Sequence, residues 1–193
     1  MKPLTSSTKR RDFLRNSGLA ITGLGLAGAV AFPATAQKRV VKGAGEGDIA
    51  VLQGALALEL EGIAAYQLAG ASGLLTPDVL KVALVFLGHH KGHRDSLAAL
   101  ITKAGGKPVE AKTDAEYVAD LELGKLKSQA DVIALATRLE LGATNAYVGQ
   151  VAALQDRTIA TLFAQLSTDE AVHWAVLNNA LGNAVPTPPY LFG

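Results

Sequence analysis

The amino-acid sequence predicts an all-α domain, a four-helix bundle built from two antiparallel helical hairpins that are joined by a long crossover. Three observations support this prediction. Apolar residues recur at helical spacing in four long segments. Capping residues precede these segments, and glycine follows most of them. The alternation of apolar and polar residues that is typical of strands is absent from the sequence.

The first hairpin is expected to occupy residues 48–106. Its first helix covers roughly 48–71 and ends near Ser72-Gly73. Thr76 then offers a hydroxyl N-cap, and Pro77 stands at the first helical position, where its missing N–H does no harm. The second helix therefore begins there and runs to Gly105-Gly106.

A long connection separates the two hairpins. It contains Lys107-Pro108 and a short helix that Thr113 caps, with Glu116 three residues further on. A connection of about 20 residues can cross a bundle from one end to the other. This length favours a crossover between two hairpins over a simple up-and-down bundle.

The second hairpin begins at Ser128, the N-cap of a third helix whose apolar pattern continues to Leu154. Asp156 caps the fourth helix, which stops at Gly182. Three prolines then exclude regular helix from the end of the chain. We therefore expect a bundle over residues 37–185 and a proline-rich tail over 186–193.

The first 36 residues have the order of an export signal. A basic segment precedes a Gly- and Ala-rich apolar run over 18–32 and the sequence Ala34-Thr35-Ala36, so we expect cleavage after Ala36. The apolar run is shorter than the ~20 residues of a membrane helix, and no stable membrane anchor is expected. Lys9-Arg10-Arg11-Asp12-Phe13-Leu14-Arg15 resembles the twin-arginine motif. This resemblance implies export through the twin-arginine translocation machinery to the periplasm or the cell exterior.

Charge and cysteine content narrow the function of the remaining 157 residues. The signal holds five of the 18 Lys and Arg residues and one of the 17 acidic residues, so the mature chain carries a net charge of −3. Nucleic acid is therefore not an expected partner. The chain has no cysteine, which excludes disulfides and thiolate ligands. Any metal ion must be held by His, Asp and Glu.

Each of the four helices interrupts its apolar seam with ionisable residues near its middle. Burying an unpaired carboxylate costs several kcal/mol, so these residues need partners inside the bundle. Because the mid-points of antiparallel helices meet, all of them are expected in one layer of the core. The predicted metal ligands are Glu59, His90, His93, Glu140, Glu170 and His173.

The two halves of the chain resemble each other around these residues. Glu59 and Glu140 each stand between two leucines and are followed seven residues later by a tyrosine, Tyr66 and Tyr147. These tyrosines either pack in the core with a hydrogen-bonded hydroxyl or take part in redox chemistry. His89 is either a solvated neighbour of the site or a ligand in place of His90. In the competing interpretation, Glu59 and Glu140 lie on partly exposed helix faces and pair with Arg94 or Arg138.

The pattern of Glu59, Glu140 and Glu170-x-x-His173 resembles that of ferritin-like di-iron and di-manganese proteins, and the stretch from Ala57 to Tyr66 is similar to the first helix of exported, desiccation-related ferritin-like proteins. The resemblance implies a ferritin-like bundle that binds iron or manganese. His90 stands where the family pattern has the Glu of its first Glu-x-x-His. With this carboxylate replaced, the site could hold one ion, hold two more weakly, or favour zinc or copper.

Three functions stay open at this point. The first is a metal-dependent oxidoreductase or metal-handling protein. The second is a non-catalytic bundle with an envelope or stress-protective role and a polar layer that satisfies itself. Haem between His93 and His173 is the least favoured, because it leaves three seam glutamates without a role. The alanine-rich outer faces permit a homodimer.

Overall fold

The computed structural model describes residues 45–193, so the expected export signal over residues 1–36 lies outside the described part. Four long helices make up this part, with a shorter helix and a 3-10 turn between the second and the third. No strand occurs within residues 45–193. The predicted all-α four-helix bundle is thus confirmed. The elements are α2 (Glu46–Gly70), α3 (Pro77–Lys103), α4 (Asp114–Asp120), η1 (Leu123–Lys125), α5 (Gln129–Val151) and α6 (Arg157–Ala180).

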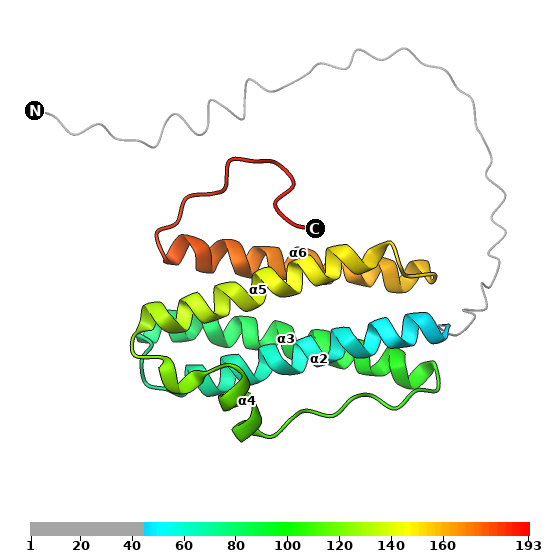
Figure 1. Cartoon of the computed structure of the whole chain (residues 1–193), viewed down its shortest axis with the longest axis horizontal. Helices are drawn as coiled ribbons and strands as arrows, with labels where there is room; N and C mark the ends of the chain where they lie inside the picture. Colours follow the sequence, from blue (N-terminus) through cyan, green and yellow to red (C-terminus); the bar gives the residue numbers. More distant parts are fainter. Residues whose placement is uncertain (1–44) are drawn as a thin grey trace, which may run out of the picture. The chain divides into compact units, whose positions relative to one another are not determined.

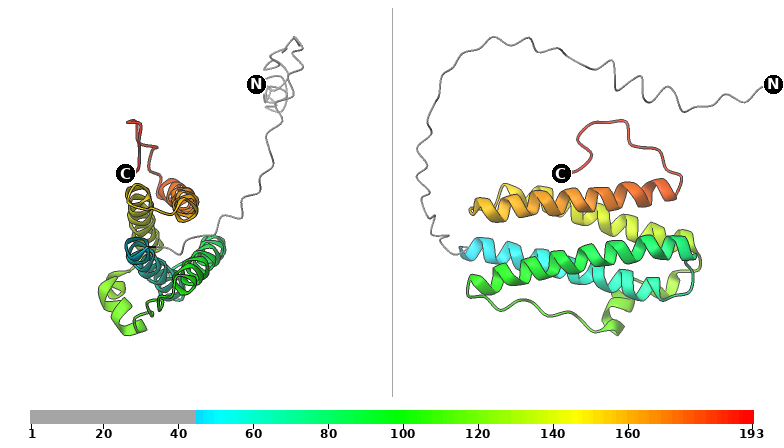
Figure 2. Two further views of the ribbon diagram at one scale, coloured as in Figure 1. Left: turned by 90° about the vertical axis from the view of Figure 1, so that its right-hand side faces the viewer. Right: turned by 180° about the vertical axis from the view of Figure 1, so that it is seen from behind.

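The helices form two hairpins that lie against each other (Figure 1). Helix α2 packs closely on α3, and α5 packs closely on α6. Helices α2 and α5 form the junction between the hairpins, whereas α3 and α6 touch at few positions. The end-on view of Figure 2 shows α3 and α6 on the same side of that junction. The contact between α3 and α6 is therefore the loosest seam of the bundle.

The long connection covers the opposite side, where α2 meets α5. Tyr117 of α4 and Leu121, the residue that follows α4, pack in one apolar cluster with Ala64 and Ala65 of α2 and Leu135 of α5. The predicted capping box is present, because Thr113 and Glu116 each accept a hydrogen bond from the other's backbone N–H. The predicted crossover thus has its own packed structure.

Helix ends follow the predicted signals, with two differences. Thr76 is the N-cap of α3, but its hydroxyl makes no capping hydrogen bond; Pro77 at the next position supplies the preset helical φ. Helix α5 ends at Val151 rather than at Leu154, and Leu154 packs against the core from the following loop. Leu154 continues the apolar pattern of α5 because it is partly buried against the core, although it lies outside the helix.

Asp48, near the start of α2, ties the α5–α6 loop to the bundle. Its carboxylate is 2% exposed and accepts hydrogen bonds from the backbone N–H groups of Gln155 and Asp156, each at 2.9 Å. The side chain of Asp156 in turn accepts from the N–H groups of Thr158 and Ile159. These bonds fix the position at which α6 begins.

Two apolar clusters fill the ends of the bundle, and the ionisable layer lies between them. One includes Leu56 and Phe163. The other includes Ile63, Phe86 and Leu177. Apolar packing at both ends thus holds the mid-points of all four helices in register, which positions the polar side chains that those mid-points carry.

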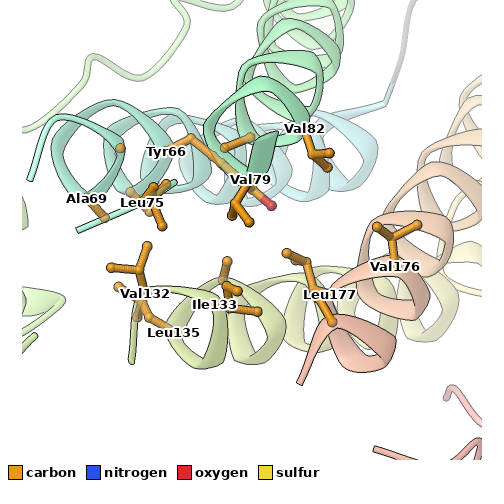
Figure 3. Close-up of a pocket in the computed structure, with 15 residues that line it drawn as sticks. Tyr66, Ala69, Leu75, Val79, Val82, Val132, Ile133, Leu135, Val176 and Leu177 are labelled. Atoms are coloured by element: carbon orange, nitrogen blue, oxygen red, sulfur yellow. The ribbon is translucent and has the colours of Figure 1, made fainter. Parts of the chain in front are cut away.

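An apolar cavity of about 100 Å³ lies beside the second cluster, lined by residues of all four long helices (Figure 3). Its walls are aliphatic except for Tyr66. Val82 and Val176 line it and are partly exposed, so the cavity reaches the surface between α3 and α6. Many of its other lining residues are alanines, which leave the space unfilled.

The chain ends in an irregular segment that turns back over α5 and α6 (Figure 1). Phe192 meets Trp174 of α6 edge to face, with ring centroids 5.2 Å apart. The N–H of Gly193 donates to Asn145 Oδ1 on α5 at 3.0 Å. Residues 181–193 contain no helix or strand, as the three prolines predict.

Helix α2 is long and apolar enough to cross a membrane, and no other described helix is. Half of the most apolar 18-residue stretch of this helix is buried inside the bundle. Its apolar composition therefore fits its place as a core helix, with a buried carboxylate at its centre.

Candidate metal centre

All six predicted ligands are buried in one layer of the bundle. Their exposed fractions run from 0% for Glu170 to 9% for His93. The interpretation of the glutamates as half-exposed is therefore wrong. Arg94, one of the cations proposed for that interpretation, pairs with Asp95 at 2.7 Å instead.

His90 lies at the centre of the layer, with a carboxylate at each of its ring nitrogens. Its Nδ1 is 2.8 Å from Glu59 Oε2, and its Nε2 is 3.2 Å from Glu140 Oε1. Gly62 of α2 makes room for the ring, because a Cβ at this position would lie 3.2 Å from His90 Cε1. This imidazole thus connects the carboxylates of the two hairpins.

His93 and His173 are arranged differently, with one nitrogen facing inward and one facing outward. Both inner Nδ1 atoms lie 3.0 Å from Glu170, His93 at Oε1 and His173 at Oε2. The outer Nε2 of His93 is 3.2 Å from Asp169 Oδ2, and the outer Nε2 of His173 is 2.9 Å from His89 Nδ1. Glu170 therefore joins the two histidines on the inside, at the seam between α3 and α6.

The two tyrosines bond crosswise between the hairpins. Tyr66 on α2 donates its hydroxyl to Glu140 on α5. Tyr147 on α5 donates its hydroxyl to Glu59 on α2. Each of these two glutamates thus accepts a hydrogen bond from the tyrosine of the other hairpin, and not from the tyrosine seven residues further along its own helix. This arrangement gives the layer an approximate two-fold symmetry that follows the internal sequence repeat.

Hydrogen bonding outweighs burial in setting the pKa of two of the three buried carboxylates. Burial alone would raise the pKa of Glu59, but its contacts with His90 and His93 lower that pKa to about 2. The same balance, with His173 and His90 as partners, holds the pKa of Glu140 well below its ordinary value. For Glu170 burial prevails and raises the pKa.

The histidines shift in the complementary direction. Burial alone would lower the pKa of His93, but hydrogen bonds with Glu170 and Glu59 raise it to about 10. Hydrogen bonds with Glu140 and Glu59 likewise outweigh burial at His90, and the pKa of His90 lies well above its ordinary value. Protons on these imidazoles thus balance the buried carboxylates, and a metal cation would have to displace them.

Two overlapping groups of donor atoms in this layer have the geometry of a metal site. Each contains four buried residues whose donor atoms lie within 4.8 Å of one another, a limit near the roughly 4 Å that separates opposite ligands around an octahedral ion. His90 and Glu170 belong to both groups. The first group adds Glu59 and His93, and the second adds Glu140 and His173.

One atom in the layer supports an additional cation. Glu140 Oε2 is buried and has no hydrogen-bond partner among the described residues. A carboxylate oxygen buried in this way is costly unless a donor or a cation satisfies it. The N and O donors present are those that iron, manganese and zinc accept. The residues therefore fit a metal centre.

Comparison with known proteins agrees with this geometry. The sequence profile of the ferritin-like domain matches residues 47–183, which include the whole polar layer and all of the four long helices except the first residue of α2. The chain belongs to the ferritin-like domain family. No curated protein matches it.

Solved structures share this ferritin-like fold. A conserved hypothetical protein from Mycobacterium tuberculosis is 23% identical with a TM-score of 0.61, over 75% of this chain and 96% of that one. A ferritin-like, diiron-carboxylate protein from Bacillus anthracis is 20% identical with a TM-score of 0.57, over 69% of this chain and 94% of that one. At these identities the likeness supports the fold alone.

Asp169 is the neighbour of the site that sequence reasoning did not single out. It lies next to Glu170 in the chain, and its half-exposed carboxylate bonds the outer nitrogen of His93. The sequence did contain a signal for Asp169. It is an acidic residue directly before Glu170-x-x-His173, one position from the apolar seam of the helix. His89 is exposed and contacts His173, so it is a hydrogen-bonded neighbour and belongs to neither donor group.

Proposed function

We propose that this protein is an exported metal-binding protein whose polar layer holds divalent iron or manganese ions. The observation that carries the proposal is the pair of overlapping donor groups that share His90 and Glu170. Each group could hold a cation, and His90 and Glu170 would be available to both. Bound iron or manganese would supply one-electron redox chemistry toward dioxygen or a peroxide.

The residues divide between the two positions. Glu170 could contribute an oxygen to each cation, since one oxygen faces His93 and the other faces His173. Glu59 with His93 would hold one cation, and Glu140 with His173 would hold the other. Asp169 orients His93 by accepting from its outer N–H, as carboxylates behind metal-binding histidines commonly do.

His90 makes the two positions unequal. A neutral imidazole has one lone pair, so His90 can coordinate one cation at a time while its other nitrogen donates to a carboxylate. Three carboxylates also leave two divalent cations without full charge compensation. We therefore propose that the site binds one ion tightly and a second more weakly.

Export is part of the proposal and rests on the sequence. The motif around Arg10-Arg11 resembles the twin-arginine signal, and the machinery that reads this signal transports folded proteins. A metal ion placed in the cytoplasm would therefore travel with the folded chain. The periplasm or the cell exterior is the proposed location.

Calorimetric titration of the metal-free mature chain tests the proposal. Anaerobic iron(II) and manganese(II) should each bind in a tight and a weaker step, with zinc(II) and copper(II) titrated for comparison. Glu170→Gln should remove the weaker step, because an amide cannot bridge two cations as a carboxylate does. Asp95→Asn, on the exposed face of α3, is the control and should bind as the wild type does. A wild-type chain that binds no ion would overturn the proposal.

Consumption of oxygen and of peroxide by the loaded protein then separates two activities. Consumption that Glu170→Gln abolishes would identify an oxidoreductase. Binding without consumption would identify a metal-handling protein.

A non-catalytic bundle is the second candidate, and one observation favours it. The imidazoles and carboxylates already hydrogen-bond one another, with Glu140 Oε2 as the exception among the buried atoms of this layer. A layer that satisfies itself in this way needs no ion to keep the bundle folded. Protein that contains no metal after purification from its native host would support this candidate.

A further inference from the structure

The polar layer can be approached from two sides of the bundle, and the two differ in what they present to solvent. The first side is the α2–α5 junction. A cavity of about 30 Å³ lies there against Glu59, His90 and Glu140, with room for about one water molecule. Leu139 lines this cavity and also packs against the crossover cluster. This side is therefore narrow and partly covered.

The second side is the seam between α3 and α6, where the two helices touch at few positions. His93, the most exposed of the six predicted ligands, lies at the floor of an open surface pocket here. Asp169, with 55% of its side chain exposed, lies on the same pocket. The other lining side chains include Ser96, Gln165 and Thr168, and none of them is a lysine or an arginine.

The seam also carries a set of outer donor atoms. His93 and His173 each direct Nδ1 toward Glu170 and Nε2 away from it. The outward nitrogens meet Asp169 and His89, both of them exposed. A carboxylate and imidazoles, the groups that bind divalent cations, thus continue from the buried layer to solvent on this side.

We propose that divalent cations reach the metal centre through the α3–α6 seam, with Asp169 and His89 as outer capture ligands. His93 and His173 then coordinate the cation from the inside. This inference rests on the proposed function, because it names the route by which that site is loaded. The physical reason is charge: the half-exposed carboxylate of Asp169 lies beside the outer nitrogen of His93 and raises the local concentration of cations there. Lys103 and Arg157 line the adjoining pocket of the seam, which does not include His93.

The rate of cobalt(II) uptake by the metal-free mature chain tests the route, since cobalt absorbs visible light when imidazole and carboxylate bind it. Gln165 lies exposed on the seam pocket and makes no hydrogen bond with a predicted ligand within residues 45–193, so its charge can be changed without altering the site. Gln165→Lys should slow uptake and Gln165→Glu should accelerate it. For a charge on the order of 8 Å from the path at ~20 mM salt, the two rates should differ roughly tenfold.

Three further measurements make the test specific. The difference between the two Gln165 variants should shrink as salt rises. Glu61 lines the cavity at the α2–α5 junction, and Glu61→Gln should leave the rate unchanged. Asp169→Asn should slow uptake at least as much as Gln165→Lys, because it removes both a negative charge and an outer ligand from the route.

Two outcomes would count against the inference, and they differ from failure of the proposed function. Equal rates for Gln165→Lys and Gln165→Glu would overturn the seam route while metal binding stands. A rate that falls in Glu61→Gln but not in Asp169→Asn would place the route at the α2–α5 junction. If the wild-type chain takes up no cobalt at all, the proposed function fails.

Discussion

Tyr147→Phe is the substitution whose effect the structure predicts most fully. Tyr147 is 0% exposed, and its hydroxyl donates to Glu59, whose carboxylate is 2% exposed. The pKa of Glu59 is lowered to about 2, so this carboxylate is ionised at neutral pH. Phenylalanine keeps the ring and its packing on Phe163 and removes only the donor.

The size of the effect depends on whether a metal ion is bound. A hydrogen bond to a buried charged group contributes about 1.5–3 kcal/mol, so the metal-free variant should lose about 2 kcal/mol of stability. A bound cation would neutralise Glu59 and reduce the bond to about 1 kcal/mol, typical of uncharged partners. Since the variant then loses about 1 kcal/mol less in the metal-bound state, it should bind metal roughly fivefold more tightly.

Urea unfolding of the mature chain, with and without metal, measures both quantities. At a typical slope of 1–3 kcal/mol per molar urea, the midpoint of the metal-free variant should fall by about 1 M. Tyr117→Phe is the matched control, because Tyr117 is also buried but its hydroxyl meets only the backbone N–H of Lys112, at 3.3 Å. A midpoint for Tyr147→Phe no lower than that of Tyr117→Phe would refute the reasoning.

Three other predictions follow from described contacts. Asp48→Asn leaves one of the two backbone N–H groups without an acceptor and should lower the unfolding free energy by about 1–3 kcal/mol in thermal melts. Ala136→Leu fills part of the apolar cavity and should raise that free energy by about 1 kcal/mol, while xenon, which should bind the wild-type cavity in crystals under pressure, should no longer bind. Metal-free protein should be most stable between about pH 4.5 and 6.5 in urea titrations. The depressed pKa of Glu59 gives stability that is lost as pH falls from 4.5 through about 2, and the raised pKa of His93 gives stability that is lost as pH rises from 6.5 through about 10.

The helices and the identity of the polar layer were predictable because both depend on local pattern. Caps such as Thr113 and Asp156 act within one turn of the chain, so their positions identify helix starts. Glu59 and Glu140 interrupt apolar seams at equal depth, and antiparallel packing brings equal depths together. The sequence therefore predicted which side chains meet.

Contacts between distant segments were not predictable in the same way. The repeat placed a tyrosine on the same helical face as each glutamate, about two turns further on, but it did not indicate that Tyr66 bonds Glu140 and Tyr147 bonds Glu59. That exchange depends on how α2 crosses α5. The contact of Phe192 with Trp174 depends in the same way on the path of the tail, for which no periodic signal exists.

The orientations of the histidine rings were likewise not predictable from the sequence. An i, i+3 spacing places His90 and His93 on one face of α3, yet the two rings serve different surroundings. His90 has carboxylates at both nitrogens, whereas His93 has one nitrogen toward Glu170 and one toward half-exposed Asp169. The difference arises because α3 lies close to α2 and touches α6 at few positions.

Metal content is the measurement that tests the central claim most directly. Protein purified from its native host and the double variant Glu59→Gln, Glu140→Gln would be compared by mass spectrometry, with circular dichroism to show that both are folded. We expect between one and two equivalents of iron or manganese in the wild type and a loss of most of this metal in the folded variant. Wild-type protein without bound metal, or a variant that retains the same amount, would contradict it.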